Sequence, residues 1–170
     1  TVISTFAGCG GSSLGYKWAG GKVLAAVEWE QNAVDTYRLN HEETIVLHRD
    51  ITTVTAQELF EMCGMKTGEL DIFDGSPPCQ GFSNEGYKRK DDPRNSLVWS
   101  YLEIVRRINP QVWVFENVPG FKRSYGGYYY KLITDELRAW NYHWRDFILN
   151  AADYGVPQNR QRFLLIAARD

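Results

Sequence analysis

The chain opens on the stretch TVISTFAGCGG, residues 1–11, and this stretch indicates the fold. Residues 2–6 are mostly apolar or β-branched, which is typical of a buried strand. Gly8, Gly10 and Gly11 follow at once, and glycines permit a tight turn and a close approach of a ligand to the backbone. The opening residues therefore predict a buried strand whose carboxyl end carries a turn that can bind a ligand.

Strands and helices are predicted to alternate along the rest of the chain. Short apolar runs, the strand candidates, occupy residues 2–6, 23–27, 44–47, 71–73, 112–115, 144–149 and 163–167. Helical periodicity is found over residues 30–40, 96–109 and 129–140. The alternation predicts an α/β fold, a Rossmann-like, doubly wound and mostly parallel sheet with helices on both faces. In such sheets ligands bind beyond the carboxyl ends of the strands, so we expect the chemistry at that edge.

Length, composition and charge restrict the possible partners. The 170 residues are 44% hydrophobic and 24% charged, as expected for a globular domain with a core. No apolar run approaches the ~18 residues of a membrane span, and no secretory leader is visible. The net charge of −2 lacks the excess of Lys and Arg with which stand-alone DNA binders displace counterions. If DNA is the partner, we expect its main binding surface outside these residues.

One of the three cysteines lies in an unusual loop. Cys9, Cys63 and Cys79 form no CxxC pair, which favours a reducing cytoplasm and indicates neither a zinc site nor a disulfide framework. Cys79 belongs to GSPPCQGFS, residues 75–83, where two prolines stiffen the loop and remove two backbone donors. A thiolate there suits addition to an electron-poor ring carbon. The alternative is a buried structural cysteine, a type that seldom lies between two prolines and a glycine.

Two carboxylates follow predicted strands. Glu28 comes about 20 residues after the glycine turn, the offset at which an acidic side chain meets ribose hydroxyls. Ser13 stands where a dinucleotide site has a third glycine, which favours a nucleoside cofactor over NAD. Glu116 ends the run 112–115, where desolvation raises the pKa of a carboxyl group and allows it to donate a proton. The alternatives are an ordinary strand-to-helix turn for the glycines and a turn or capping role for Glu116.

Two arginines enter the last predicted strand. Arg160 and Arg162 are two residues apart, and alternation along a strand places such residues on one side. The pair could hold a phosphate, a base oxygen or Glu116. Two solvated charges on a strand edge are the alternative.

Five segments, FAGCGGSSLG, VEWE, GSPPCQGFS, ENV and QNRQRF, together resemble the bacterial type of C5 cytosine-specific DNA methyltransferase in order and spacing. The resemblance covers residues 4–166, and the Pro-Cys loop followed by Glu-Asn-Val is its most specific part. It implies the S-adenosylmethionine-dependent methyltransferase fold, methyl transfer from S-adenosyl-L-methionine to carbon 5 of cytosine, and S-adenosyl-L-homocysteine as product. It also implies double-stranded DNA with a flipped cytosine as substrate, a role in restriction-modification or epigenetic marking, and a cytoplasmic monomer without a metal or a membrane span.

The resemblance also assigns roles to individual residues. The implied catalytic residues are Cys79, Glu116, Arg160 and Arg162. Cys79 becomes the nucleophile that adds to the cytosine ring, and Glu116 protonates or hydrogen-bonds ring nitrogen 3. The implied cofactor contacts are Phe6, Ala7, Gly8, Gly10, Gly11, Glu28, Trp29, Asp50, Ile51, Asp74, Pro78 and Leu97. Among them, Glu28 binds the ribose and Trp29 stacks near the adenine.

Two features depart from the family pattern. Ser4 and Thr5 stand where family members often carry an acidic and then an apolar residue, so we expect a weaker contact with the methionine amino group. The target-recognition region and the later motifs are absent, so residues 1–170 are expected to form an incomplete catalytic domain that is inactive alone. Three alternatives stay open: a methyltransferase of transfer RNA, a non-catalytic cofactor-binding subunit, and a nicotinamide dehydrogenase, which leaves the Pro-Pro-Cys loop unexplained.

Overall fold

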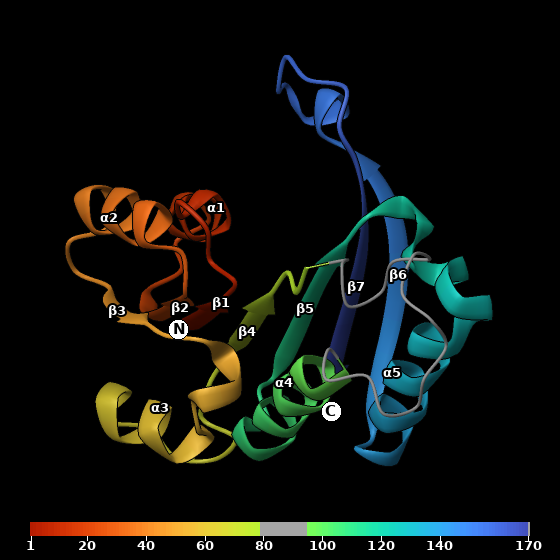
Figure 1. The fold of residues 1–170 in the computed structure, drawn as a ribbon, viewed down its shortest axis with the longest axis horizontal. Coiled ribbons are helices and arrows are strands. Elements are labelled where there is room, and N and C mark those ends of the chain that lie inside the picture. Colours follow the sequence, from red (N-terminus) through yellow and green to blue (C-terminus); the bar gives the residue numbers. More distant parts are fainter. Residues whose placement is uncertain (79–94, 170) are drawn as a thin grey trace.

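A twisted sheet with helices on both faces is shown by the computed structural model, which describes residues 1–78 and 95–169 (Figure 1). The described elements are, in order, β1 (Val2–Thr5), α1 (Gly11–Trp18), β2 (Val23–Glu28), α2 (Gln31–Asn40), β3 (Ile45–His48), the 3-10 helix η1 (Ile51–Thr53), α3 (Ala56–Cys63), β4 (Ile72–Gly75), α4 (Asn95–Ile108), β5 (Val112–Asn117), η3 (Pro119–Gly127), α5 (Tyr128–Ala139), β6 (Tyr142–Asn150), η4 (Ala151–Tyr154) and β7 (Gln161–Arg169). The strand order is β3-β2-β1-β4-β5-β7-β6, and of the described strands only β7 runs opposite to the other six. The predicted mostly parallel α/β sheet is confirmed.

The first strand determines where a ligand can bind. β1 is buried along its whole length and pairs with β2 on one side and with β4 on the other. The chain moves outward from β1 to β2 and β3, and then returns to β4 on the opposite side of β1. A reversal of this kind leaves a crevice between the two loops at the carboxyl ends of the central strands.

The main apolar core lies between the sheet and helices α3, α4 and α5. Trp113 of β5 is fully buried there and donates a hydrogen bond from its Nε1 to the Tyr101 hydroxyl at 2.8 Å. A run of aromatic rings with centroids 4.9–5.9 Å apart crosses this core from Phe6 through Tyr101, Trp113, Phe115 and Phe121 to Phe163. Each buried ring contributes about 2 kcal/mol by removal of apolar surface from water, so this face carries most of the stability.

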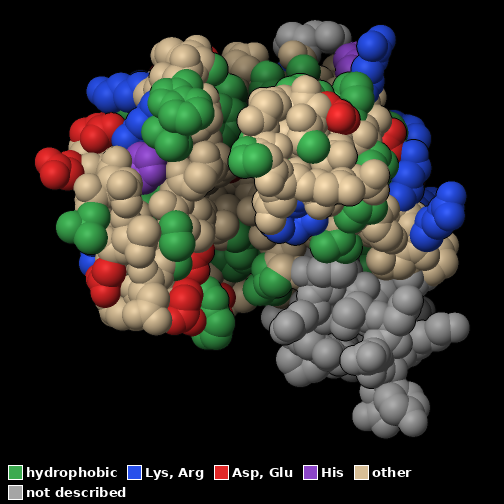
Figure 2. Space-filling view, turned by 90° about the horizontal axis from the view of Figure 1, so that it is seen from above, with side chains coloured by type: hydrophobic (Ala, Val, Ile, Leu, Met, Phe, Trp, Pro, Cys, Tyr) green, Lys and Arg blue, Asp and Glu red, His purple; other side chains and the backbone are tan. Residues whose placement is uncertain are grey.

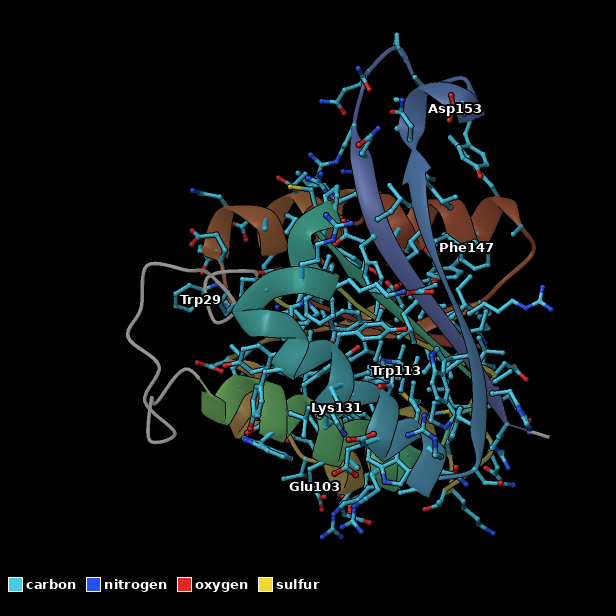
Figure 3. The ribbon with its side chains drawn as sticks, turned by 90° about the vertical axis from the view of Figure 1, so that its right-hand side faces the viewer. Trp29, Glu103, Trp113, Lys131, Phe147 and Asp153 are labelled. Atoms are coloured by element: carbon cyan, nitrogen blue, oxygen red, sulfur yellow. The ribbon has the colours of Figure 1, made fainter. Side chains whose placement is uncertain are left out.

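The opposite face of the sheet is covered only in part. Helices α1 and α2 lie over β1, β2 and β3, where Ala7, Ala26 and Tyr37 form a second, smaller cluster (Figure 1). Beyond α1, the face formed by β5, β7 and β6 leaves Phe147 and Ile166 each 40% exposed. Figure 3 shows Phe147 and Trp113 on opposite sides of the sheet. The face that carries Phe147 is therefore the open one.

All seven predicted strands are present, with ends shifted by at most two residues, and the three predicted helices are shifted by one. Helices α1 and α3 were not predicted. α1 has only eight residues and includes two glycines, which weakens its apolar periodicity. α3 does carry a start signal, because the Thr55 side chain accepts a hydrogen bond from the amide of Glu58, as in a capping box. No helix within the described ranges is long and apolar enough to cross a membrane.

Gly75, the last residue of β4, tests how tightly the core and the ligand edge are joined. A Cβ atom at this position would lie 2.2 Å from the Tyr101 hydroxyl and 2.6 Å from Thr5 Oγ1, and both neighbours are buried. Gly75→Ala is therefore expected to lower the free energy of unfolding by about 2 kcal/mol, measured by urea denaturation. Gly120→Ala is the control, since no described atom beyond its own chain neighbours and helical turn lies within 4 Å of its Cβ position, and it should change the stability by less than about 0.5 kcal/mol. Equal stabilities for the two variants would contradict the close packing.

Candidate active site

Two adjoining hollows lie at the carboxyl ends of β1 and β4. The first, here called the pocket, has a volume of about 290 Å³. Its walls include seven predicted cofactor contacts, namely Phe6, Glu28, Trp29, Asp50, Ile51, Pro78 and Leu97. The second, here called the groove, has a volume of about 780 Å³ and contains Ala7, Gly8, Asp74, Glu116, Arg160 and Arg162. Phe6, Ser76 and Pro78 line both hollows, so one molecule can extend from the pocket into the groove.

Glu28 is held in place by the backbone around it. Its carboxylate accepts hydrogen bonds from the amides of Gly8 at 2.7 Å, Trp29 at 2.8 Å and Glu30 at 2.9 Å. The side chain is 8% exposed and ends β2, so the glycine turn after β1 is tied to the neighbouring strand. A carboxylate has about four acceptor positions, and three are used by amides. The remaining acceptor capacity suits a hydroxyl group of a ligand in the pocket.

The rest of the pocket suits a planar ring. Ile51 is buried, and Trp29 is 69% exposed at the rim, on the edge of the molecule (Figure 3). The Asp50 carboxylate accepts a hydrogen bond from the amide of Thr52 at 2.9 Å, which fixes it at the start of η1. Apolar walls with a fixed polar edge are typical of sites for nucleobases. Three further residues that were not predicted as contacts also line the pocket, namely Val27, Arg49 and Ser76.

Gly10 and Gly11 line neither hollow in the described part of the chain. Gly10 has a φ of 92°, and a Cβ there would lie 2.3 Å from the Nε2 atom of His41. His41 is buried, and its Nε2 lies 3.1 Å from the Gly10 carbonyl oxygen. The geometry thus gives Gly10 a steric reason for being glycine, and it identifies His41 as a support of the turn that sequence reasoning missed.

The groove brings together three of the four predicted catalytic residues. Arg162 Nε lies 2.9 Å from a Glu116 carboxylate oxygen, because antiparallel pairing of β5 with β7 places them on neighbouring strands. Arg160 lines the same groove. Desolvation raises the pKa of Glu116 above its ordinary value, although the charges of Arg162 and Arg160 act in the opposite direction. Glu116 therefore keeps its proton to a higher pH than an exposed glutamate does.

Asn117 joins β5 to the loop that leads to the fourth predicted catalytic residue. Its side chain is 3% exposed, donates to the Pro77 carbonyl at 3.1 Å and accepts from the amide of Val118 at 2.9 Å. Cys79 itself lies outside the described residues. Pro78, the residue before it, lines both hollows. The chain thus enters the Pro-Cys loop at the junction of the pocket and the groove.

Figure 2 looks onto the face that carries α1 and α2. It shows a hollow between these two helices and the protruding end of β6 and β7. The groove lies there, with α1 on one side and β5 and β7 on the other. Fold and site together define an α/β protein in which a carboxyl group of raised pKa lies beside a ligand pocket at the carboxyl ends of the central strands.

Comparison with known proteins identifies the family. The family model described as C-5 cytosine-specific DNA methylase matches residues 1–170, and the chain belongs to this family. It is 37% identical over 177 residues to the type II methyltransferase M.AquIA of Picosynechococcus sp. and 39% identical over 171 residues to M.DdeI of Desulfomicrobium norvegicum. In each case 99% of this chain is aligned, which spans 71% of the first relative and 40% of the second.

Structural comparison gives the same result. A DNA modification methyltransferase encoded within an E. coli prophage superposes with a TM-score of 0.82 at 30% identity. The superposition covers 99% of this chain and 46% of the prophage protein. The chain thus spans less than half of this neighbour and of M.DdeI.

The hydrogen bond from Asn117 to Pro77 predicts a stability effect. Asn117→Asp keeps the acceptor for Val118 but removes the donor and places a carboxylate against a buried carbonyl. We expect a loss of about 2 kcal/mol, which lowers the melting temperature by about 4–8 °C in a calorimetric scan. Asn150→Asp is the control, because Asn150 uses its Oδ1 to accept from the amides of Ala152 and Arg160 and would lose only the hydrogen bond that its Nδ2 donates to Asn159 at the surface. A melting temperature for Asn117→Asp equal to that of the control would show that the bond does not hold the loop.

Proposed function

We propose that this chain carries the cofactor-binding and catalytic part of an enzyme that transfers a methyl group from S-adenosyl-L-methionine to carbon 5 of cytosine in DNA. The observation that carries the proposal is the shared wall of Phe6, Ser76 and Pro78 between the pocket and the groove. A sulfonium donor bound across this wall is adjacent to the Glu116–Arg162 pair and to the loop that leads to Cys79. Membership of the C-5 cytosine-specific DNA methylase family supports the same reaction.

The residues of the pocket fit the proposed cofactor. Glu28 offers a fixed acceptor for the ribose hydroxyls, while Trp29 and Leu97 provide apolar walls for the adenine. Asp50 and Ile51 line the pocket and are proposed to contact the edge of the adenine. When bound, S-adenosyl-L-methionine supplies an activated methyl group and leaves as S-adenosyl-L-homocysteine. The residues of the chain position this donor beside the groove and activate the cytosine for methyl transfer.

The reaction requires activation of the base before methyl transfer, because carbon 5 of cytosine is a poor nucleophile. The Cys79 thiolate adds to carbon 6 of the flipped cytosine, which makes carbon 5 electron-rich. Carbon 5 then takes the methyl group, a base removes the proton from carbon 5, and the restored double bond expels the thiolate. Cys79 is regenerated, so the step balances without an oxidant or a reductant.

Glu116 and the arginines are proposed to stabilise the activated ring. A protonated Glu116 donates to ring nitrogen 3, where negative charge develops as the thiolate adds. Arg162 fixes the orientation of Glu116, and Arg160, which lines the same groove, is proposed to hold the base oxygen. Burial of Glu116 serves this role because it raises the pKa of the carboxyl group, which then keeps its proton to a higher pH than an exposed glutamate does.

Recognition of DNA is proposed to depend on sequence beyond the part aligned here. The chain carries a net charge of −2, whereas gripping DNA phosphates requires a surplus of positive charge. M.DdeI and the prophage methyltransferase have more than half of their length outside the aligned region. We place the target-recognition surface in the corresponding part of the full-length protein, and we propose that this protein acts as a cytoplasmic monomer in restriction-modification or epigenetic marking.

Removal of the nucleophile tests the reaction. In the full-length protein, Cys79→Ala should abolish transfer of tritiated methyl groups to duplex DNA and trapping on 5-fluorocytosine oligonucleotides. Binding of S-adenosyl-L-homocysteine should survive, because the pocket walls stay intact. Cys63→Ala is the matched control; Cys63 is half-buried in α3, burial raises the pKa of its thiol, and transfer should persist. Substantial methylation by Cys79→Ala would refute the role of Cys79. Methylation of transfer RNA but not of duplex DNA by the wild-type protein would identify transfer RNA as the substrate.

The proton of Glu116 predicts a pH dependence. Protonated Glu116 becomes scarcer as the pH rises through its raised pKa, so methyl transfer should fall on the basic side of the profile. Glu116→Gln should lower the turnover rate by about 10²–10⁴-fold and remove this basic limb, because an amide donates at every pH. Glu103→Gln is the control on the surface of α4 (Figure 3), where Arg106 and Arg107 hold the carboxyl pKa at about 2. An unchanged basic limb in Glu116→Gln would exclude this residue as the proton donor.

A further inference from the structure

We infer that Asp74 provides the anionic partner for the α-ammonium group of the cofactor's methionine arm, in a polar recess formed by Ser4, Ser12, Tyr16 and Asp74. The inference rests on the proposed function, since it names the group that binds the far end of the same cofactor.

The recess is built around one buried carboxylate. Ser4 and Ser12 each donate to Asp74 Oδ2 at 3.0 Å, and the Tyr16 hydroxyl donates to Oδ1 at 3.2 Å. Asp74 is 6% exposed, yet it lines the groove together with Ser12 and Tyr16. Ser4 is the register partner of Asp74 on the adjacent strand, so β1 and β4 present these two side chains on the same face.

This carboxylate has no cationic partner among the described residues. All three of its side-chain donors are neutral hydroxyl groups, whereas Glu116, the other acid of the groove, is paired with Arg162. A buried charge without a partner is costly, and burial raises the pKa of Asp74 although hydrogen bonds from Ser12, Ser4 and Tyr16 oppose the shift. A cation that enters the groove would therefore interact more favourably with Asp74 than with an exposed acid.

The position of the recess selects the end of the cofactor. Asp74 precedes Ser76 by two residues, and Ser76 belongs to the wall shared by the pocket and the groove. With the nucleoside in the pocket, the amino-acid arm would extend past this wall into the groove, where Asp74 is the acid that has no cationic partner in the described part of the chain. Within residues 1–78 and 95–169, Oδ1 accepts from Tyr16 only, so this oxygen retains an acceptor position for an ammonium donor. Burial also raises the pKa of Tyr16, which keeps its hydroxyl neutral and donating.

Two ammonium groups could satisfy this chemistry, the cofactor's own and that of a lysine from elsewhere in the full-length protein. Calorimetric titration distinguishes them with two ligands, S-adenosyl-L-homocysteine and its deaminated analogue, which keeps the nucleoside, the thioether and the carboxylate. Both are titrated into the full-length wild-type protein and into Asp74→Asn, which preserves the shape of the side chain. We expect Asp74→Asn to weaken the binding of S-adenosyl-L-homocysteine by about 10–100-fold and the binding of the analogue by less than about twofold.

A swap of the two register partners provides a matched control. Asp74→Ser removes the carboxylate, and Ser4→Asp combined with Asp74→Ser returns it to the same recess from the neighbouring strand. The double variant should recover most of the affinity for S-adenosyl-L-homocysteine that Asp74→Ser loses. Recovery would show that the charge matters, because a purely structural role of Asp74 would leave the double variant at least as weak as the single one.

Each remaining outcome overturns the inference. An equal loss for both ligands would mean that Asp74 only maintains the shape of the groove. Unchanged affinity for S-adenosyl-L-homocysteine in Asp74→Asn, with a lower melting temperature, would indicate that the Asp74 carboxylate pairs with a lysine of the full-length protein. In both cases the wild type still binds S-adenosyl-L-homocysteine and the proposed function stands. A wild-type protein that binds neither ligand would instead remove the proposed function, and the inference with it.

Discussion

The close packing of β1 against β4 is the constraint on which the rest of the structure depends. The Thr5 hydroxyl donates to the Asp74 carbonyl at 2.9 Å, and Gly75 leaves room for the Tyr101 hydroxyl where any side chain would collide. Tyr101 in turn accepts the indole hydrogen of Trp113, so the strand ends are joined to the aromatic core. Because the switch of strand order occurs between β1 and β4, the same contacts that complete the core also fix the floor of the site.

The two faces of the sheet have different tasks. Helices α3, α4 and α5 bury the large aromatic and aliphatic side chains, whereas the open face carries the polar groove. Desolvated acids such as Asp74 and Glu116 oppose folding unless they are paired or protonated, since burial raises the pKa of both. Burial of apolar side chains on the other face offsets this cost. The site can therefore retain buried acidic groups that interact with a ligand.

Much of this arrangement could be predicted from the sequence, because strands, turns and the Pro-Cys loop have local signatures. The seven strands and the residues Glu28, Glu116 and Arg162 were recognisable from apolar runs and their ends. Contacts across the sheet were not, since strand order and register decide them. Ser4 lacks the acidic group that family members often carry, yet register places the carboxylate of Asp74 beside it, 70 residues later in the chain. His41 behind Gly10 was hidden for the same reason.

The backbone of the site is held by side chains that have no part in the chemistry. Three amides converge on Glu28, Asn117 holds the Pro77 carbonyl, and His41 backs the glycine turn. Glu28 and Asn117 each join the carboxyl end of one strand to the backbone that follows another strand, and His41 joins the end of α2 to the glycine turn, so the described backbone around the pocket is held in place before a ligand arrives. Preorganised loops lose little conformational entropy on binding. Binding energy can then be used to desolvate the base and to bring it against a nucleophile, which is the harder task for an enzyme that attacks an aromatic ring.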